Sequence, residues 1–230
     1  MATRFACDSS SRFSDERLMI SRNVLVLGAT GGTGRHVVAQ ALEQGHVVTA
    51  FVRDASRLSP VSDRLRVVTG SVTDDGPALA MAVRGQDAVI SSLGLGKSLK
   101  SHGLIAESVP RIVGAMKSEG VRRLIFTSAF GVGETIRDVP LIPRLFIGTL
   151  LRDMYHDKQA GEVQLDSSGL DWTLVYPTGL SDGPATGQYR VGERLLLRGF
   201  PRIARADVAA FLLTQIDDAR YMRKRVLISS

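Results

Sequence analysis

The chain has 230 residues, of which 44% are hydrophobic and 23% charged, and its formal net charge is +6. This size suits one globular domain, and no apolar run reaches the roughly 18 residues that span a bilayer or resembles a secretory signal, so we expect a cytoplasmic protein that does not bind membranes. The single cysteine, Cys7, excludes an internal disulfide and a cysteine zinc site, and the four histidines form no spaced set, so we expect no metal.

The positive charge is distributed along the whole chain. Lysines and arginines are interleaved with acidic residues nearly everywhere, and the densest basic run is 223–225. Nucleic-acid binding usually requires a basic stripe, often with aromatic residues, and none is present. We therefore expect the charge to attract a small anionic ligand, with no nucleic-acid partner.

The first half of the chain predicts alternating strands and helices. Residues 1–21 are polar and serine-rich, which predicts a disordered leader, and Met19 is an alternative start. Strands are then predicted at 24–27, 47–52, 65–68, 88–92 and 124–127, with helices at 34–42, 76–84 and 103–119. Pro110 predicts a kink or a late start of the last of these helices. Strands this apolar are typical of a parallel sheet covered on both faces.

The second half continues the alternation and then becomes irregular. A helix is predicted near 149–168, a strand at 172–176, a helix at 206–216 and a strand at 225–228. Residues 177–204 are rich in glycine and proline, which predicts loop with room for one short hairpin. The pattern indicates an α/β Rossmann fold, with a doubly wound, mostly parallel sheet, helices on both faces and a small C-terminal substrate cap at about 177–204. We expect residues 22–230 to form this single domain.

A glycine-rich segment, 28–34, lies between the first strand and the first helix. Gly28 permits a sharp turn, Gly31 lets the backbone approach a pyrophosphate, and Gly34 lets the helix pack on the sheet. The helix N-terminus then offers N–H groups and a positive dipole end to phosphates. The alternative is a glycine turn that binds nothing.

The end of the second strand indicates which dinucleotide binds. An NAD site places an acid there to bind the ribose, whereas this chain has Arg53, whose guanidinium suits the 2′-phosphate of NADP. Thr30, Ser56 and Arg57 are potential supports. The alternative is that Arg53 is solvated and Asp54 binds the ribose. We expect NADP(H) to be preferred over NAD(H).

Several segments together resemble the atypical short-chain dehydrogenase/reductase families, in the NAD(P)H-binding group that includes flavin reductase/biliverdin reductase B and NmrA-like proteins. The resemblance covers nearly all of the chain after the leader. It rests on NVLVLGATGGTG, FVRDASRL, GQDAVISSLG, IVGAMKSEGV, LIFTSAFG, SSGLDWTLVYPTGL, DGPATGQY and RADVA.

The resemblance implies a set of cofactor-binding residues. By it, the pyrophosphate is held by Gly28, Thr30, Gly31, Gly32, Thr33 and Gly34, the 2′-phosphate by Arg53, and the adenine by Ser71 and Val72. Leu93 and Gly94 would flank the cofactor, Thr127 would lie near the nicotinamide, and Tyr176, Pro177 and Thr178 would line the same cleft.

Three residues are candidates for catalysis. Ser128 follows the fifth strand, at the sheet edge where open α/β sheets bind ligands, and its hydroxyl can donate to a substrate carbonyl; the alternative is a serine that only satisfies its turn. Tyr155 and Lys158 resemble the tyrosine and lysine of short-chain dehydrogenases, although they are three residues apart instead of four. An ordinary amphipathic-helix tyrosine is the better interpretation of Tyr155, whereas Lys158, with Glu162, fits the atypical families.

These features favour an NADPH-dependent oxidoreductase that passes hydride to a flavin-like, quinone-like or carbonyl acceptor. The alternatives are a non-catalytic NAD(P)-sensing regulator of the NmrA-like kind and a sugar epimerase or dehydratase. Gly179 stands where biliverdin reductase B carries a histidine, which favours the sensor. The apolar segment 139–151 would form core, a lid or a subunit contact, so we expect a monomer or a homodimer.

Overall fold

The structure is a computed structural model that describes residues 20–58, 62–94, 96, 100–139, 144–145, 148–149, 151–197 and 199–230. The predicted leader, with Cys7 and Met19, lies outside these residues except for its last two positions. Much of the apolar segment 139–151 also lies outside them.

Strands and helices follow the chain in the predicted order. The strands are β1 (Asn23–Leu27), β2 (Val47–Val52), β3 (Leu65–Thr69), β4 (Ala88–Ser91), β5 (Arg123–Thr127), β6 (Asp171–Pro177), β7 (Gly179–Ser181), β8 (Arg190–Gly192), β9 (Arg202–Ala204) and β10 (Lys224–Ser229). The helices are α1 (Gly32–Glu43), α2 (Gly76–Val83), α3 (Leu104–Ser118), α5 (Arg152–Asp166) and α6 (Arg205–Thr214), with 3-10 helices η1 (Ala55–Arg57) and η2 (Gly133–Asp138).

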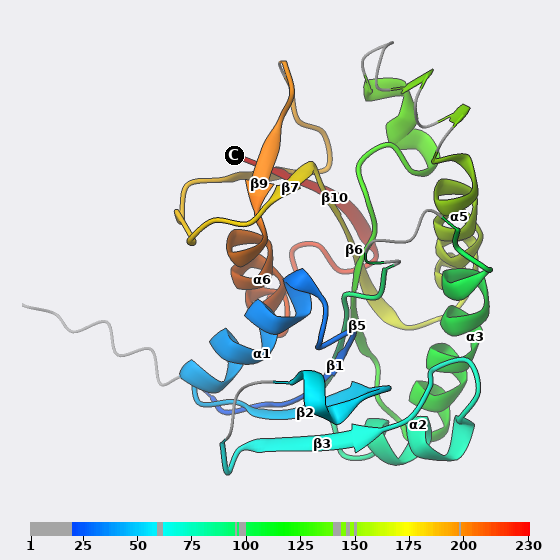
Figure 1. Cartoon of the computed structure of the whole chain (residues 1–230), viewed down its shortest axis with the longest axis vertical. Coiled ribbons are helices and arrows are strands. Elements are labelled where there is room, and N and C mark those ends of the chain that lie inside the picture. Colours follow the sequence, from blue (N-terminus) through cyan, green and yellow to red (C-terminus); the bar gives the residue numbers. More distant parts are fainter. Residues whose placement is uncertain are drawn as a thin grey trace, which may run out of the picture.

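The main sheet has the order β3-β2-β1-β4-β5-β6-β10-β8 (Figure 1). Every neighbouring pair is parallel except β10 and β8, which are antiparallel. The order reverses between β1 and β4, where a doubly wound sheet opens a crevice at the carboxyl ends of its strands. The predicted α/β fold is therefore confirmed.

Helices cover both faces of the sheet, as Figure 1 shows, with α1 and α6 on one side and α2, α3 and α5 on the other. Alternate residues of β1 pack against the helices on opposite faces of the sheet. Val24 and Val26 pack with α1 and α6, and Leu25 and Leu27 pack with the helices on the other face. All four are fully buried. Side chains of this size contribute about 1.5–3 kcal/mol each on burial, which explains why the strands are apolar at consecutive positions.

The cap and one connection differ from the predictions. Among the described residues between β2 and β3 there is only η1, so the βα alternation is not strict there. The expected hairpin in 177–204 is wrong: β7 pairs in parallel with β9, and β8 adds to the edge of the main sheet. Parallel pairing needs a connection of a dozen or more residues, and segment 182–201 supplies it.

Pro110 lies inside α3, so the predicted late start of this helix is wrong. A proline in a helix leaves the carbonyl four residues earlier without its backbone donor. That carbonyl belongs to Ala106, and the side-chain amide of Gln164 on α5 donates to it at 3.3 Å. The neighbouring helix thus compensates for the missing bond.

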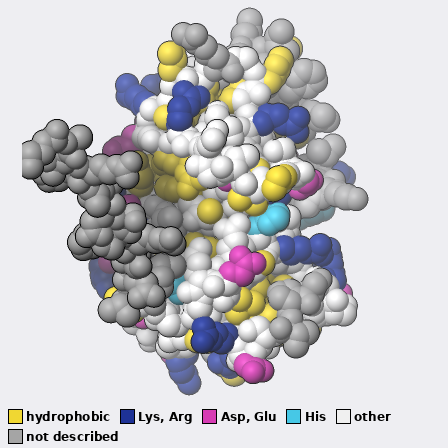
Figure 2. Space-filling model, turned by 90° about the vertical axis from the view of Figure 1, so that its left-hand side faces the viewer, with side chains coloured by type: hydrophobic (Ala, Val, Ile, Leu, Met, Phe, Trp, Pro, Cys, Tyr) yellow, Lys and Arg dark blue, Asp and Glu magenta, His cyan; other side chains and the backbone are white. Residues whose placement is uncertain are grey.

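Charged groups are mixed on the face of the molecule shown in Figure 2. Lysine and arginine side chains lie there in separate groups, with apolar and acidic side chains between them. Within the described residues, no helix is long and apolar enough to cross a membrane.

Candidate functional site

The glycine-rich turn joins β1 to α1 and has the geometry expected of such a motif. Gly28 has a φ of 79°, and the Gly31 N–H donates to its carbonyl oxygen at 2.9 Å, which closes the turn. A Cβ on Gly28 would lie 2.8 Å from the backbone oxygen of Ser92, and a Cβ on Gly34 would overlap the Gly28 carbonyl. Only glycine therefore lets α1 start so close to the ends of β1 and β4.

The start of α1 leaves backbone N–H groups without a side-chain cap. Gly31 is the N-cap and no side chain caps the helix, so its first N–H groups remain available for a ligand. Gly31 and Gly32 are exposed, whereas Thr33 and Gly34 are buried, and Thr30 is half-buried. Exposed N–H groups at the positive end of the helix dipole fit a diphosphate.

The predicted 2′-phosphate site lies just beyond β2. Arg53 is exposed there, and the Arg35 guanidinium donates to the backbone oxygen of Arg57 at 3.4 Å. The rival residue, Asp54, uses one carboxylate oxygen within its own turn: Oδ1 accepts hydrogen bonds from Ser56 N–H at 3.0 Å and Ser56 Oγ at 2.7 Å. These bonds lower the pKa of Asp54, so its carboxylate stabilises the turn into η1.

The remaining predicted cofactor contacts follow β3 and β4. The Ser71 hydroxyl donates to Asp74 at 2.7 Å, and Val72 is buried. Leu93 is half-buried and Gly94 is exposed. The strands β3 and β4 are parallel to β1 and lie on either side of it, β3 beyond β2 and β4 directly beside β1, so these residues share the sheet edge of the glycine turn. Contact with the adenine or the ribose stays a prediction.

A buried acid connects two hydroxyl groups at the ends of β5 and β6. The Ser128 hydroxyl donates to Glu162 Oε1, and the Tyr176 hydroxyl donates to Glu162 Oε2 at 2.7 Å. Lys158 lies one helical turn before Glu162 on α5, so both side chains share a face of that helix. We call these four residues the Glu162 cluster.

Burial dominates the electrostatics of the Glu162 cluster. Burial raises the pKa of Glu162, although the bonds from Ser128 and Tyr176 and the charges of Arg225 and Lys158 oppose the change. Burial also lowers the pKa of Lys158 from 10.5 to about 8, against the attraction of Glu162 and Asp157. A carboxyl group that keeps its proton more readily than usual and an amine that loses it more readily are suited to proton transfer near neutral pH.

Other predicted site residues lie around this cluster with different partners. The Tyr155 hydroxyl donates to the backbone oxygen of Phe130 at 3.1 Å, so its proton is occupied in this structure. The Thr127 hydroxyl is buried at the end of β5 without a hydrogen-bond partner in the described part of the chain. Pro177 is buried, and the Thr178 hydroxyl bonds to Ser229 at 3.2 Å. Ligand binding by these residues stays a prediction.

Two features of the site were not assigned a role from the sequence. Glu162 was noticed beside Lys158, but its central position depends on partners 34 and 14 residues away. Arg205, in the segment RADVA, lies against Gly32 of the glycine turn. The helical spacing of Lys158 and Glu162 was the available signal for the first, and no local signal pointed to the second.

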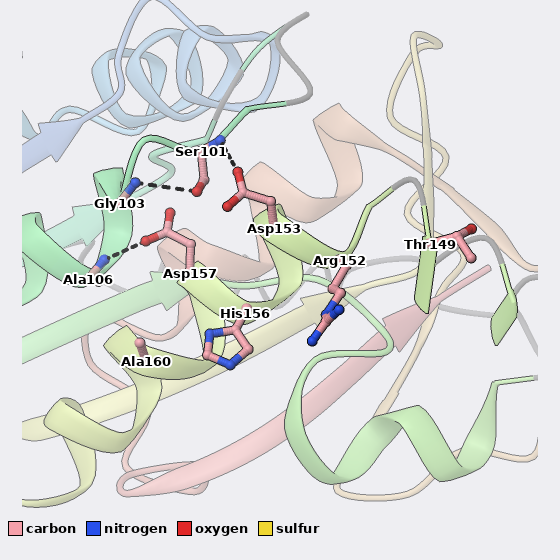
Figure 3. A pocket seen from close by; sticks show the side chains of 9 residues that line it. All are labelled: Ser101, Gly103, Ala106, Thr149, Arg152, Asp153, His156, Asp157 and Ala160. Atoms are coloured by element: carbon pink, nitrogen blue, oxygen red, sulfur yellow. Dashed lines mark hydrogen bonds between the residues drawn. The ribbon is translucent and has the colours of Figure 1, made fainter.

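A separate cavity of about 570 Å³ opens between the start of α3 and the start of α5 (Figure 3). Asp153 accepts from the Ser101 N–H at 2.6 Å, and Asp157 accepts from the N–H groups of Ile105 and Ala106 at 3.0 and 2.9 Å. Asp157 therefore caps the first turn of α3, and Asp153 fixes the segment that leads into this helix. The cavity is lined by Ser101, Gly103, Ala106, Thr149, Arg152, Asp153, His156, Asp157 and Ala160.

No metal-binding arrangement was found in the part of the chain that the structure describes. There, no three or more histidine, cysteine, aspartate or glutamate side chains come together in a way that could hold an ion.

Known proteins resemble this chain in sequence and in fold. An uncharacterized chloroplastic protein of Arabidopsis thaliana, At2g34460, is 29% identical over 185 residues, which cover 75% of this chain and 64% of that protein. The chain spans about half to two thirds of the length of the first curated relatives that it matches.

Two solved structures share the fold. ChuY of Escherichia coli O157:H7, described as an Anaerobillin Reductase, has a TM-score of 0.74 at 24% identity, covering 90% of this chain and 96% of that one. A short-chain dehydrogenase/reductase of Veillonella parvula, solved in complex with NADP, has a TM-score of 0.76 at 20% identity, covering 91% and 94%. At these identities they show a Rossmann-type fold alone.

Comparison with protein families matches residues 28–219 to the family described as NAD(P)H-binding. The match begins at the first glycine of the turn and includes the Glu162 cluster and the cap. The chain therefore belongs to the NAD(P)H-binding family.

Proposed function

We propose that this protein is an NADPH-dependent oxidoreductase that reduces a flat, conjugated acceptor of the flavin or quinone type, or a carbonyl compound. The observation that carries the proposal is the Glu162 cluster, because Ser128 and Glu162 share a hydrogen bond at the sheet edge that also carries the glycine turn, and the Tyr176 hydroxyl holds the other carboxyl oxygen of Glu162. A reductase needs both a dinucleotide site and a proton source near the acceptor.

The preference for NADPH rests on Arg53 and Asp54. Arg53 is exposed beyond β2, and Asp54 is held by Ser56 in the turn, so the ribose side of the site presents a cation more readily than a carboxylate. A guanidinium binds a phosphate with paired, charge-assisted hydrogen bonds. The extra 2′-phosphate of NADPH fits this arrangement.

The bound dinucleotide would supply the hydride, and Ser128 and Glu162 of the Glu162 cluster would supply the proton. When Glu162 is ionised, the Ser128 hydroxyl gives its hydrogen to Oε1 and has none for an acceptor. When Glu162 is protonated, its own O–H can donate to Ser128, and the Ser128 hydrogen becomes available. Ser128 would then pass a proton to the reduced acceptor while Glu162 replaces it, and Glu162 would regain its proton from solvent.

The raised pKa of Glu162 supports this order of events, because burial keeps more of the carboxyl group protonated than in water. The cap is also small: β7 and β9 have three residues each, and the loops between them are largely exposed. A shallow, open acceptor side suits a flat molecule.

Two observations favour a non-catalytic NAD(P)-sensing protein as the second candidate. The hydroxyl of Tyr155, the residue that resembles the tyrosine of short-chain dehydrogenases, is bonded to the Phe130 backbone, and Gly179 has no side chain where biliverdin reductase B carries a histidine. A sensor would bind the dinucleotide and turn nothing over.

The deciding experiment measures NADPH oxidation with FMN, riboflavin and small quinones as acceptors, beside calorimetric titrations of NADPH and NADH. We expect turnover with at least one acceptor, tighter binding of NADPH, and a strong loss of turnover in Ser128→Ala with binding retained. Ser167→Ala, an exposed serine at the end of α5, is the matched control. Tight NADPH binding without turnover on any acceptor would support the sensor instead.

A further inference from the structure

Arg205 is the first residue of α6, and its side chain lies over the glycine turn. A Cβ placed on Gly32 would come within 2.8 Å of both Cδ and Nε of Arg205. Gly32 is the first residue of α1, where the helix offers its N–H groups. The absence of a side chain at position 32 therefore lets a guanidinium approach the start of this helix.

The same guanidinium is bonded to the cap. Arg205 Nη1 donates to Oδ1 of Asp182 at 2.5 Å, and Asp182 directly follows β7. The Arg205 side chain is 25% exposed and that of Asp182 is 84% exposed. An ion pair with one such solvated partner contributes little to stability, about 0–1 kcal/mol, so it does not explain why a cation is placed beside an anion-binding turn.

We propose that Arg205 is a further ligand of the dinucleotide, binding its diphosphate beside the N-terminus of α1. A guanidinium has five N–H donors in a planar fork, so donation to Asp182 leaves others for phosphate oxygens. The cation adds to the positive end of the α1 dipole, and both favour the same anion. The negative charge of Asp182 partly offsets that of the guanidinium and so opposes binding of an anion.

This inference rests on the proposed dinucleotide site and adds a residue to it. It predicts different effects on ligand binding for changes at Arg205 and at Arg53. The diphosphate is common to NADPH and NADH, so a change at Arg205 weakens both ligands by the same factor. The 2′-phosphate belongs to NADPH alone, so a change at Arg53 weakens only NADPH.

The test is calorimetric titration of the full chain with NADPH and with NADH. In Arg205→Met, which keeps the length of the side chain over Gly32, we expect the affinity for both ligands to fall roughly ten- to a hundredfold, the value of a charge-assisted hydrogen bond. Arg205→Lys keeps the charge but not the fork, and its loss should be smaller. Arg202→Met, an exposed arginine on β9, is the control and should bind as the wild type does.

Asp182→Asn gives an independent check, because the amide oxygen still accepts from Arg205 while the competing negative charge is gone. We expect both ligands to bind several-fold more tightly. Thermal unfolding by circular dichroism establishes that each variant is folded. Equal affinities in wild type and in folded Arg205→Met and Arg205→Lys would overturn the inference while leaving the cofactor site intact, and no binding of either ligand to the wild type would overturn both.

Discussion

Replacement of Lys158 by methionine should stabilise the folded protein, because it removes a buried ionisable group. The Lys158 side chain is 7% exposed, and burial lowers its pKa from 10.5 to about 8. Each pH unit between the two values corresponds to about 1.4 kcal/mol, so the protonated amine costs the folded state about 3 kcal/mol at neutral pH. Methionine has similar volume and no charge, so we expect Lys158→Met to unfold at higher urea, with a free energy of unfolding larger by up to about 3 kcal/mol at pH 7.

The pH dependence identifies the cause. Between pH 8 and 10.5 the unfolded lysine holds its proton and the folded one has lost it, so the stability of the wild type rises with pH across this window. The difference between variant and wild type should therefore be largest below pH 8 and disappear near pH 10.5. Lys117→Met, at an exposed position of α3, serves as control and should change stability by less than about 0.5 kcal/mol. A less stable Lys158→Met protein at pH 7, or a difference that ignores pH, would refute this reasoning.

Three further changes test other parts of the structure. Burial raises the folded pKa of Glu162, so the wild type loses stability as pH rises above 4.5, where the unfolded carboxyl group ionises more readily than the folded one. The free energy of unfolding of Glu162→Gln, measured in urea, should therefore increase relative to that of the wild type as pH rises above 4.5. The same pH dependence in both proteins would contradict this. In Arg53→Ala, titration should show about tenfold weaker NADPH binding with NADH binding unchanged, and a parallel loss of both would remove Arg53 from the 2′-phosphate site. Asp207→Ala removes a fully buried carboxylate that accepts three hydrogen bonds from Thr186 and Gly187 of the cap. The free energy of unfolding, measured in urea, should fall by about 3 kcal/mol, and by less in Asp207→Asn. A fall below about 1 kcal/mol in Asp207→Ala would mean that the cap tolerates the change.

The fold followed from local patterns because each pattern had a local cause. Consecutive apolar residues from Val24 to Leu27 predicted a strand buried on both faces, and the structure divides them between two helix layers. The glycine turn was also a local signal, since Gly28 and Gly34 are required by the backbone around them. The prediction of a hairpin in the cap failed because β7 and β8 each pair with strands far along the chain, and no local pattern specifies such partners.

The site was only partly predictable for the same reason. Ser128 was located by its position after a strand, but the partner that controls its proton comes from α5, 34 residues later. Helical spacing placed Lys158 and Glu162 on one face, yet it could not indicate that this face is buried against β5 and β6. Arg205 lies against Gly32 only because α6 packs beside α1, a contact that the complete sheet order creates.

Helix α5 explains how a costly cluster can be held in place. On one face it carries Lys158 and Glu162, two ionisable groups whose burial opposes folding. Other residues of α5 attach it to α3. Asp157 caps the first turn of α3, and a Cβ on Gly161 would lie only 2.7 Å from Ile105, so the two helices are in close contact. Because a packed helix pair resists small shifts, the position of Glu162 relative to Ser128 and Tyr176 is determined by contacts that carry no catalytic role. The α3–α5 contact therefore positions the Glu162 cluster, and Gly161→Ala, which forces the two helices apart at Ile105, should lower turnover although no group of the cluster is changed.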